Sequence, residues 1–396
     1  MEGNIIIDSV QHSELTPQKT NLLMTLMGLF LMAGVGAGIY AQMVGHHHAF
    51  ANTRDVPWGM LIGVYAYFAI ISTGLCIMAA LTHLFHIKLL EPLANRMVWL
   101  SIIMLLSAFT VIGLEIENPW RMPLGVLFHP NLTSNIWWMG TLYGMAVGIM
   151  FVEFYLIVTG RFKPALILGL LGAVTEMFAN SNLGSVFASL GARPFWYGAQ
   201  LPIFFLSCAF LCGAAAVILF THYAHLLRCE RMSHTTFQAL RFAGRLMLVM
   251  IFLVGLATAW KIANSYCGTE EMRRAADAVI RGPLAKSFWL FEIGIGLVLP
   301  MALLAFSRLR SLQALSLASL LVLVGQFVAR YNLVVAGLII PQYAEFSSDA
   351  PAYLTYSPAP AEHLLVVGGI GVMGLGFLIG EKKFAKLFSA DNSESH

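Results

Sequence analysis

The chain has 396 residues, of which 58% are hydrophobic and only 11% are charged. Soluble domains hold about 25% charged residues, so this composition excludes a soluble enzyme and predicts an all-α polytopic membrane protein. The net charge of +3 is small, which argues against a nucleic-acid-binding protein.

Ten apolar stretches are each long enough to cross a bilayer, which takes about 20 residues. The polar start of the chain has no basic segment directly before an apolar one, so we expect no cleaved signal peptide. We therefore expect the first apolar stretch to be retained as a span. The predicted spans are residues 20–44, 57–84, 96–115, 135–160, 164–182, 198–226, 242–263, 286–306, 312–340 and 361–380.

The basic residues are distributed unequally between the two sides that these spans define. The side that holds both termini and the loops after even-numbered spans carries fourteen lysines and arginines, against eight on the other side. Cytoplasmic loops carry the excess of basic residues in membrane proteins. This bias predicts a multi-pass chain with both termini in the cytoplasm.

The second and sixth spans repeat one another along the sequence. When Gly59 is aligned with Gly198, Gly74 falls on Gly213, and residues 82–86 (THLFH) fall on residues 221–225 (THYAH). Both spans run in the same direction, so the pattern indicates a parallel duplication. It predicts two four-helix bundles flanked by two peripheral helices. The predicted divisions are a cytoplasmic tail (1–19), the first span and outer loop (20–56), the first four-helix bundle (57–182), the second (183–340), an outer loop and last span (341–380) and a cytoplasmic tail (381–396).

Several polar side chains lie within or at the ends of the predicted spans. Ionisable residues are costly in hydrocarbon, so each is a candidate functional residue. The topology places six of them in the outer half or at the outer boundary: Tyr65, Glu115, Glu176, Asn182, Glu292 and Arg330. The alternative interpretation is that these residues are structural. In that interpretation Glu292 and Arg330 form an ion pair, and Glu115 caps a helix end.

Glu153 differs from these residues because it lies in the inner half of the fourth span. Either it passes protons between the cytoplasm and a deeper site, or its side chain extends to the inner interface.

Histidines and cysteines do not form a recognisable metal motif. The five cysteines contain no CxxC pair, so we predict no iron–sulfur cluster in this chain. We interpret His46–His48 as an exposed loop, and His83, His86, His222 and His225 as residues that suit helix C-termini. The competing hypothesis is a haem held by His83 and His222, which the repeat relates to each other.

Several motifs together resemble the NrfD/PsrC family, the quinone-reacting membrane subunits of polysulfide, nitrite and related respiratory reductases. The resemblance covers most of spans two to nine. It rests on the order and spacing of these segments: Pro57 to Gly74 with Tyr65 between them, Glu115 to Trp120, Asn131 to Trp138, Asn182 to Trp196, Phe288 to Glu292 with Pro300, and Ala329 to Tyr331.

The resemblance implies a quinone, menaquinone or ubiquinone, near the outer face of the first bundle. By position it implies that Tyr65 and Asn182 bind the quinone, although a relative has a histidine and a tyrosine there. Glu117 and Asn118 replace the family's Gly-Arg pair, and Arg121 is the arginine that could take that role. No haem is implied in this chain.

The resemblance also implies partners and a location. The expected partners are a ferredoxin-like iron–sulfur subunit on the outer, periplasmic face and a further catalytic subunit such as a molybdopterin enzyme, a hydrogenase or a cytochrome. The chain is then expected in a prokaryotic cytoplasmic (inner) membrane, in contact with lipid.

The mechanism that we predict is quinol oxidation near the outer leaflet, or its reverse, with Glu115 or Glu176 exchanging protons. A carboxylate beside a quinone suits that role. Two alternatives remain open on the sequence: a haem b-bearing cytochrome subunit, and a secondary transporter, which the parallel repeat and the intramembrane acids would also fit.

Overall fold

The structure is a computed structural model that describes residues 17–84, 87–342 and 351–388. Most of the two predicted tails, His86 and residues 343–350 of the outer segment 341–360 lie outside the described residues, as does the side chain of His83.

The described residues are almost entirely helical, and ten helices are long and apolar enough to span a membrane. The predicted all-α polytopic fold is therefore confirmed. The elements are α1 (Pro17–Val44), α2 (His46–Ala49), α3 (Met60–Leu84), η1 (Lys88–Leu93), α4 (Ala94–Glu115), α5 (Arg121–Phe128), α6 (Asn135–Val158), α7 (Phe162–Ala188), α8 (Gln200–Arg228), α9 (His234–Cys267), α10 (Glu270–Ile280), η2 (Ser287–Val298), α11 (Leu299–Ser307), α12 (Leu312–Ala336), α13 (Pro360–Lys383) and η4 (Ala385–Phe388).

The eighth span differs from a regular helix. It begins as the π-helical η2 and continues without a break into α11, where Pro300 is near the first residue. The π-helical turns change which side chains face the bundle, and such segments are frequent at functional sites. The ninth span ends at Ala336, four residues before the predicted boundary.

Polar residues define where several helices begin. The hydroxyl groups of Ser134, Ser233, Thr269 and Ser311 each accept a hydrogen bond from a backbone N–H three residues further on, at the starts of α6, α9, α10 and α12. These N-caps satisfy donors that a helix start leaves free. Local sequence thus fixes these boundaries independently of the apolar packing.

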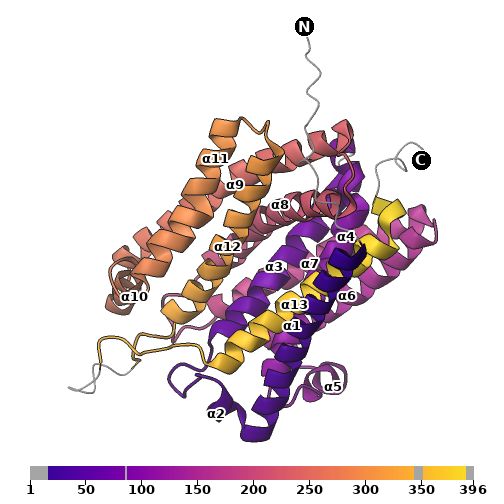
Figure 1. Cartoon of the computed structure of the whole chain (residues 1–396). Helices are drawn as coiled ribbons and strands as arrows, with labels where there is room; N and C mark the ends of the chain where they lie inside the picture. Colours follow the sequence, from indigo (N-terminus) through magenta and orange to yellow (C-terminus); the bar gives the residue numbers. More distant parts are fainter. Residues whose placement is uncertain (1–16, 85–86, 343–350, 389–396) are drawn as a thin grey trace.

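The elements gather into two groups around a central pair of helices (Figure 1). Helix α3 packs against α4, α7 and α8, while α8 also packs against α9 and α12. Helices α1 and α13 lie side by side along the outside of the first group, where Gly34 and Gly368 let the two backbones meet closely. Whether the groups act as two separate bundles stays a prediction.

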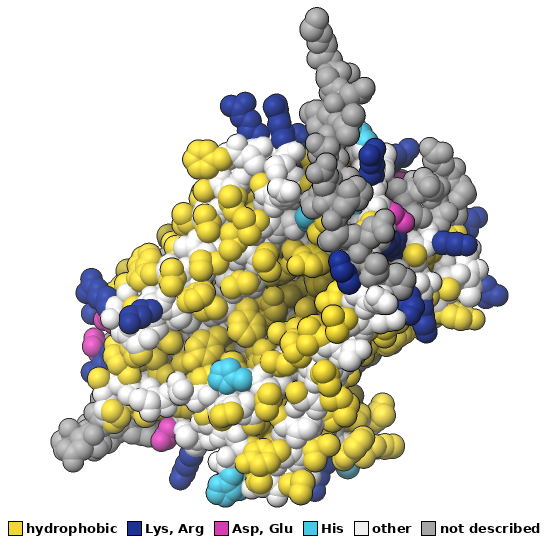
Figure 2. Space-filling model, viewed as in Figure 1, with side chains coloured by type: hydrophobic (Ala, Val, Ile, Leu, Met, Phe, Trp, Pro, Cys, Tyr) yellow, Lys and Arg dark blue, Asp and Glu magenta, His cyan; other side chains and the backbone are white. Residues whose placement is uncertain are grey.

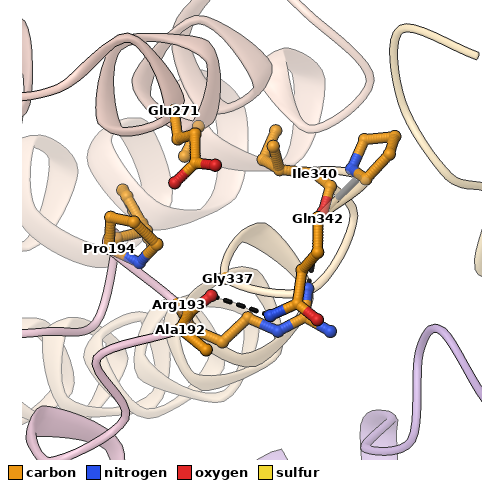
Figure 3. A pocket seen from close by; sticks show the side chains of 10 residues that line it. Ala192, Arg193, Pro194, Glu271, Gly337, Ile340 and Gln342 are labelled. Atoms are coloured by element: carbon orange, nitrogen blue, oxygen red, sulfur yellow. Dashed lines mark hydrogen bonds between the residues drawn. The ribbon is translucent and has the colours of Figure 1, made fainter. Parts of the chain in front are cut away.

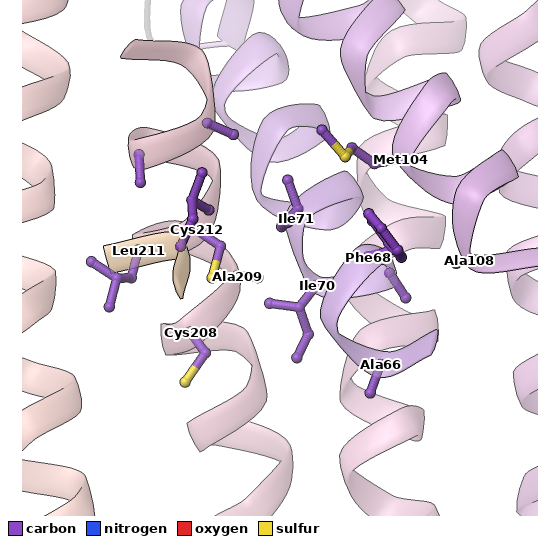
Figure 4. Packing of buried hydrophobic residues seen from close by; sticks show 14 of the residues in the cluster. Ala66, Phe68, Ile70, Ile71, Met104, Ala108, Cys208, Ala209, Leu211 and Cys212 are labelled. Atoms are coloured by element: carbon purple, nitrogen blue, oxygen red, sulfur yellow. The ribbon is translucent and has the colours of Figure 1, made fainter. Parts of the chain in front are cut away.

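Two glycines that the repeat aligns, Gly74 and Gly213, are in direct contact where α3 crosses α8. Equivalent residues meet in this way on a two-fold axis, so the contact agrees with the internal repeat that the sequence predicts. Buried side chains of both helices surround the crossing, including Ile70 and Ile71 from α3 and Cys208 from α8 (Figure 4).

Gly74→Ala is expected to destabilise the chain by about 1–3 kcal/mol, because a Cβ there would overlap the Ala209 carbonyl of α8. The matched control is Gly113→Ala on α4, where a Cβ meets no atom within 4 Å and the change to Ala favours helix. Unfolding in detergent compares the two. Equal stability of both variants would contradict the close crossing of α3 and α8.

The outer surface of the helices is apolar, as a lipid-facing surface requires. Hydrophobic side chains cover the middle of the molecule, and most charged side chains lie toward its edges (Figure 2). Large exposed side chains include Leu29 of α1, Phe252 of α9 and Phe306 of α11. This distribution fits an integral multi-pass membrane protein.

A buried ion cluster fixes the end of α13. The Glu381 carboxylate accepts a hydrogen bond of 2.9 Å from Arg96 Nε of α4 and pairs with Arg228 at the end of α8. Arg96 is 2% exposed, so its charge depends on this partner. The cluster joins the last helix to both groups of helices.

Candidate functional site

The most deeply buried carboxylate within the first group of helices belongs to Glu176, at the middle of α7. Its side chain is fully buried. The Thr73 hydroxyl donates to one carboxylate oxygen at 2.6 Å, and the Ser72 hydroxyl approaches the other at 3.0 Å. Two hydroxyl groups of α3 therefore hold an acidic group of α7 in one orientation inside an apolar bundle.

Three further buried side chains of this region each have at least one polar atom that lacks a hydrogen-bond partner. The Tyr65 hydroxyl and both amide atoms of Asn180 have none among the described residues. The Tyr143 hydroxyl lies near the Thr73 hydroxyl but outside hydrogen-bond geometry. The rings of Tyr65 and Tyr143 meet edge to face, 6.3 Å apart. Because buried polar groups are normally hydrogen-bonded, these atoms require water or a ligand. Glu176 interacts electrostatically with both tyrosines.

These residues, which we call the first-bundle polar cluster (Tyr65, Ser72, Thr73, Tyr143, Glu176 and Asn180), form a series in depth. At 1.5 Å per helical residue, Tyr65 lies about 8 Å from the outer end of its helix. Tyr143 and Asn180 lie about 12 Å from theirs, and Glu176 about 18 Å. Helix α7 runs from Phe162 to Ala188, so Glu176 lies near its midpoint.

Glu153 of α6 continues this series toward the inner side. Its side chain is 5% exposed and its carboxylate lies against Gly169 of α7, where a side chain would collide with it. Gly172 is next to the same carboxylate and precedes Glu176 by about one helical turn. The Glu153 side chain therefore packs against α7. This position supports a buried role for Glu153 better than an extension of its side chain to the inner interface.

Two residues that the sequence predicts to bind the cofactor, Asn182 and Arg121, do not contact the Glu176 carboxylate. The Asn182 amide donates to the backbone carbonyl of Asn135 at 2.7 Å, which joins α7 to the start of α6. Arg121 is exposed at the first residue of α5. Neither residue contacts the carboxylate of Glu176 among the described residues.

Glu115, the last residue of α4, belongs to a separate outer cluster. One of its carboxylate oxygens is buried and unpartnered, while its side chain lies within hydrogen-bonding reach of Asn52. Nearby, the buried Glu362 accepts hydrogen bonds from Tyr356 and from the backbone N–H of Ala51. The Tyr356 hydroxyl in turn accepts one from the backbone N–H at the start of α3, at 2.7 Å. Glu115 is thus outside the first-bundle polar cluster.

Glu292 and Arg330, predicted as a proton path or an ion pair, do not form an ion pair within 4.0 Å among the described residues. Asn332 donates to Glu292 at 2.9 Å. The Arg330 guanidinium donates to Cys208 Sγ at 3.0 Å. It also lies over the rings of Phe204 and Phe205. The same guanidinium donates to the Gln326 amide oxygen at 3.3 Å. Aromatic faces attract a cation, so Arg330 is held without a carboxylate partner within 4.0 Å among the described residues.

An arginine joins the outer loops of the two groups. Arg193 donates to the carbonyls of Leu338 and Asp55, at 3.3 and 3.1 Å. It lines a pocket of about 280 Å³ that also includes Glu271 of α10 (Figure 3). The same pocket is closed on one side by Gln342, whose amide donates to the carbonyl of Ala192. This outer surface combines loops from three regions of the sequence.

The sequence analysis missed Ser72, Thr73, Tyr143 and Asn180. Helical spacing contained part of the signal: Ser72 follows Tyr65 by seven residues, and Asn180 follows Glu176 by four, so each pair shares a helix face. No comparable pattern distinguished Tyr143 from the other aromatic residues of its span.

A search of the described residues finds no group of three or more His, Cys, Asp or Glu side chains able to hold a metal ion. His222 is half-buried and its Nδ1 atom is unpartnered. The haem hypothesis also needs His83, whose side chain lies outside the described residues.

The fold defines an all-α polytopic membrane protein with clusters of buried polar side chains between its helices. Residues 49–342 match the family described as "Polysulphide reductase, NrfD". The chain belongs to this family, as its sequence motifs indicated.

Two relatives are similar over nearly their whole length. The Hdr-like menaquinol oxidoreductase integral membrane subunit of Archaeoglobus fulgidus is 23% identical over 372 residues, which cover 90% of this chain and 92% of the relative. A selenate reductase subunit of Mesobacillus selenatarsenatis is 22% identical, with the same shares covered.

Proposed function

We propose that this chain is the quinone-binding membrane subunit of a respiratory oxidoreductase complex, with its quinone site at the first-bundle polar cluster. The observation that carries the proposal is a fully buried carboxylate beside buried tyrosine and asparagine groups that have no partner among the described residues. Membership of the NrfD family supports it, as does the relative named a menaquinol oxidoreductase subunit.

Several residues of the cluster have a chemical role in this proposal. A bound quinol supplies two electrons and two protons, and the residues position its head group and move the protons. The Tyr65 hydroxyl and the Asn180 amide donate hydrogen bonds to its oxygens. Glu176 accepts the two protons one after the other, passing the first on before it accepts the second, while Ser72 and Thr73 orient its carboxylate. Asn182 and Arg121 stay candidates from the sequence, although the geometry favours Asn180.

The electrons pass to an external partner. We propose a ferredoxin-like iron–sulfur subunit on the outer face, supported by the clustering there of α10, the loop of Arg193 and residues 337–342, which follow α12. A second, catalytic subunit would complete the complex. The selenate reductase relative supports a reductase as one such complex. The location is a prokaryotic cytoplasmic membrane with both termini in the cytoplasm.

Binding of a fluorescent hydroxyquinoline N-oxide, a quinol analogue, to the purified chain tests the proposal. Asn180→Ala and Tyr65→Phe are each expected to weaken binding by about 5–30-fold, because a hydrogen bond to a buried group is worth about 1–2 kcal/mol. Asn182→Ala is expected to have a smaller effect. Unchanged binding by both the Asn180 and the Tyr65 variants would place the quinone elsewhere.

The same geometry supports a proton path from Glu176 to Glu153. The Glu153 carboxylate lies against Gly169 and Gly172 at the α6–α7 contact. Glu176 follows Gly172 by about one turn of α7, and its carboxylate is held by α3. If the path operates, Glu153→Gln in the reconstituted complex lowers the number of protons moved per electron. An unchanged ratio would remove Glu153 from the path and leave the quinone site as proposed.

A further inference from the structure

A second aromatic pocket lies in the other group of helices, between α8, α9, η2 and α12. It is a half-open pocket of about 380 Å³, counting the space at its mouth, and has three phenylalanines in its walls. Phe195, Phe204 and Phe288 are each at most 8% exposed. Aromatic side chains of this kind pack favourably against a planar ring.

The pocket also contains both a hydrogen-bond donor and an acceptor. The Lys261 ammonium lies 4.0 Å from the centre of the Phe195 ring, and it forms no hydrogen bond or ion pair with the part of the chain described here. Glu292 and Asn332, which are hydrogen-bonded to each other, also line the pocket. Because an ammonium carries three donors, Lys261 has capacity to bind an oxygen atom in the pocket.

The surroundings of the pocket indicate an amphiphilic ligand. Apolar side chains next to the pocket residues along the same elements are exposed, with Trp260 of α9 at 61% and Phe291 of η2 at 38%. A ligand with an apolar tail would reach the pocket from lipid along this surface. Since Glu292 would repel a phosphate group, a neutral head group with carbonyl oxygens fits the charges better than a phospholipid.

The internal repeat relates this pocket to the first-bundle polar cluster. On α3 and α8, Tyr65 is aligned with Phe204. Helices α7 and α12 also align at a constant offset, so that Glu176 falls on Gln326, Ala179 on Ala329, and Asn182-Leu183 on Asn332-Leu333. The two halves therefore place polar groups at similar depth on equivalent helices, while the groups themselves differ.

We propose that this pocket is a second binding site for a quinone head group, with Lys261 donating a hydrogen bond to a carbonyl oxygen and the ring between Phe195, Phe204 and Phe288. The inference rests on the proposed function, in that the chain meets quinones in its membrane. We propose only binding at this pocket. Its residues differ chemically from those of the first-bundle polar cluster.

The number of hydroxyquinoline N-oxide molecules bound per purified full-length chain is the measurement that tests this. The wild-type chain is expected to bind two. Lys261→Met is expected to bind one, and Asn180→Ala to lose the other. Lys286→Met is the matched control, because Lys286 is an exposed lysine immediately before η2. Glu292→Gln provides a second variant of the pocket if Lys261→Met does not fold.

Labelling with a photoreactive azidoquinone locates the sites. Labelled peptides from α9 or η2 that disappear in Lys261→Met would support the second site.

A single bound molecule that depends on Asn180 alone would overturn the inference and leave the proposed function intact. A single molecule that depends on Lys261 alone would support the pocket and overturn the first-bundle assignment. Displacement of the Lys261-dependent molecule by phosphatidylglycerol, without azidoquinone labelling there, would assign the pocket to phospholipid.

Discussion

Glu176→Gln is expected to lower quinone-linked turnover of the assembled complex by about 100-fold or more, the range over which a general acid or base contributes. Glutamine keeps the volume of the side chain. Its carbonyl oxygen can accept a hydrogen bond from one of the Ser72 and Thr73 hydroxyl groups, and its amide can donate one to the other. It cannot take up a proton. The variant therefore separates proton exchange from the packing of α7 against α3.

The control for this experiment is Glu91→Gln, the same chemical change at an exposed carboxylate in η1. It is expected to leave turnover unchanged. The Glu176 variant should also retain binding of the hydroxyquinoline N-oxide, because its oxygen-binding neighbours are intact. Wild-type turnover in Glu176→Gln would show that another group exchanges the protons, and Glu115 would be the next candidate.

Glu381→Ala is expected to lower the free energy of unfolding by about 3–5 kcal/mol, the usual effect of removing one partner from a buried ion pair. Arg96 would then be left 2% exposed without its carboxylate, and Arg228 would lose its closest partner. Titration with sodium dodecyl sulfate in mixed micelles measures the change.

Glu230→Ala is the matched control for Glu381. Glu230 also pairs with Arg228, but at 3.9 Å and with a side chain that is 58% exposed. Exposed ion pairs contribute about 1 kcal/mol or less, so this variant is expected to be nearly as stable as the wild type. Similar losses in both variants would contradict a buried ion cluster that fixes the end of α13.

The last helix is held by buried acids at both ends, although it lies beyond the residues that match the family. Glu362 joins its outer end to the segment before α3, and Glu381 joins its inner end to α4 and α8. Its glycines pack against α1 along the length between them. We infer that α1 and α13 form one structural unit that supports the first group of helices.

Hydropathy was sufficient to predict the ten spans, because a bilayer imposes a minimum apolar length on every crossing helix. The aligned glycines Gly74 and Gly213 also predicted an internal symmetry, and the structure shows these two residues in contact. The π-helical start of the eighth span had no comparable signal, because its hydrogen-bond register depends on the helices packed around it.

The candidate site was only partly predictable, because a polar residue in a span does not reveal which way its helix is turned. Asn180 and Asn182 are two residues apart, so they point to nearly opposite sides of α7 at 3.6 residues per turn. The structure turns Asn180 toward the buried interior and lets Asn182 bind the carbonyl of Asn135. Glu176 and Asn180 share a face, and this spacing was the usable clue. The partner of Arg330 was not predictable, since cysteine and phenylalanine replace the expected carboxylate.

The central claim is that a quinone ring binds among Tyr65, Asn180 and Glu176. A cryo-electron microscopy map of the complex with bound hydroxyquinoline N-oxide tests it most directly. We predict ring-shaped density within hydrogen-bonding distance of the Tyr65 hydroxyl and the Asn180 amide, above the Glu176 carboxylate. Ordered water filling that space, with the ring bound elsewhere in the chain or in another subunit, would contradict the account.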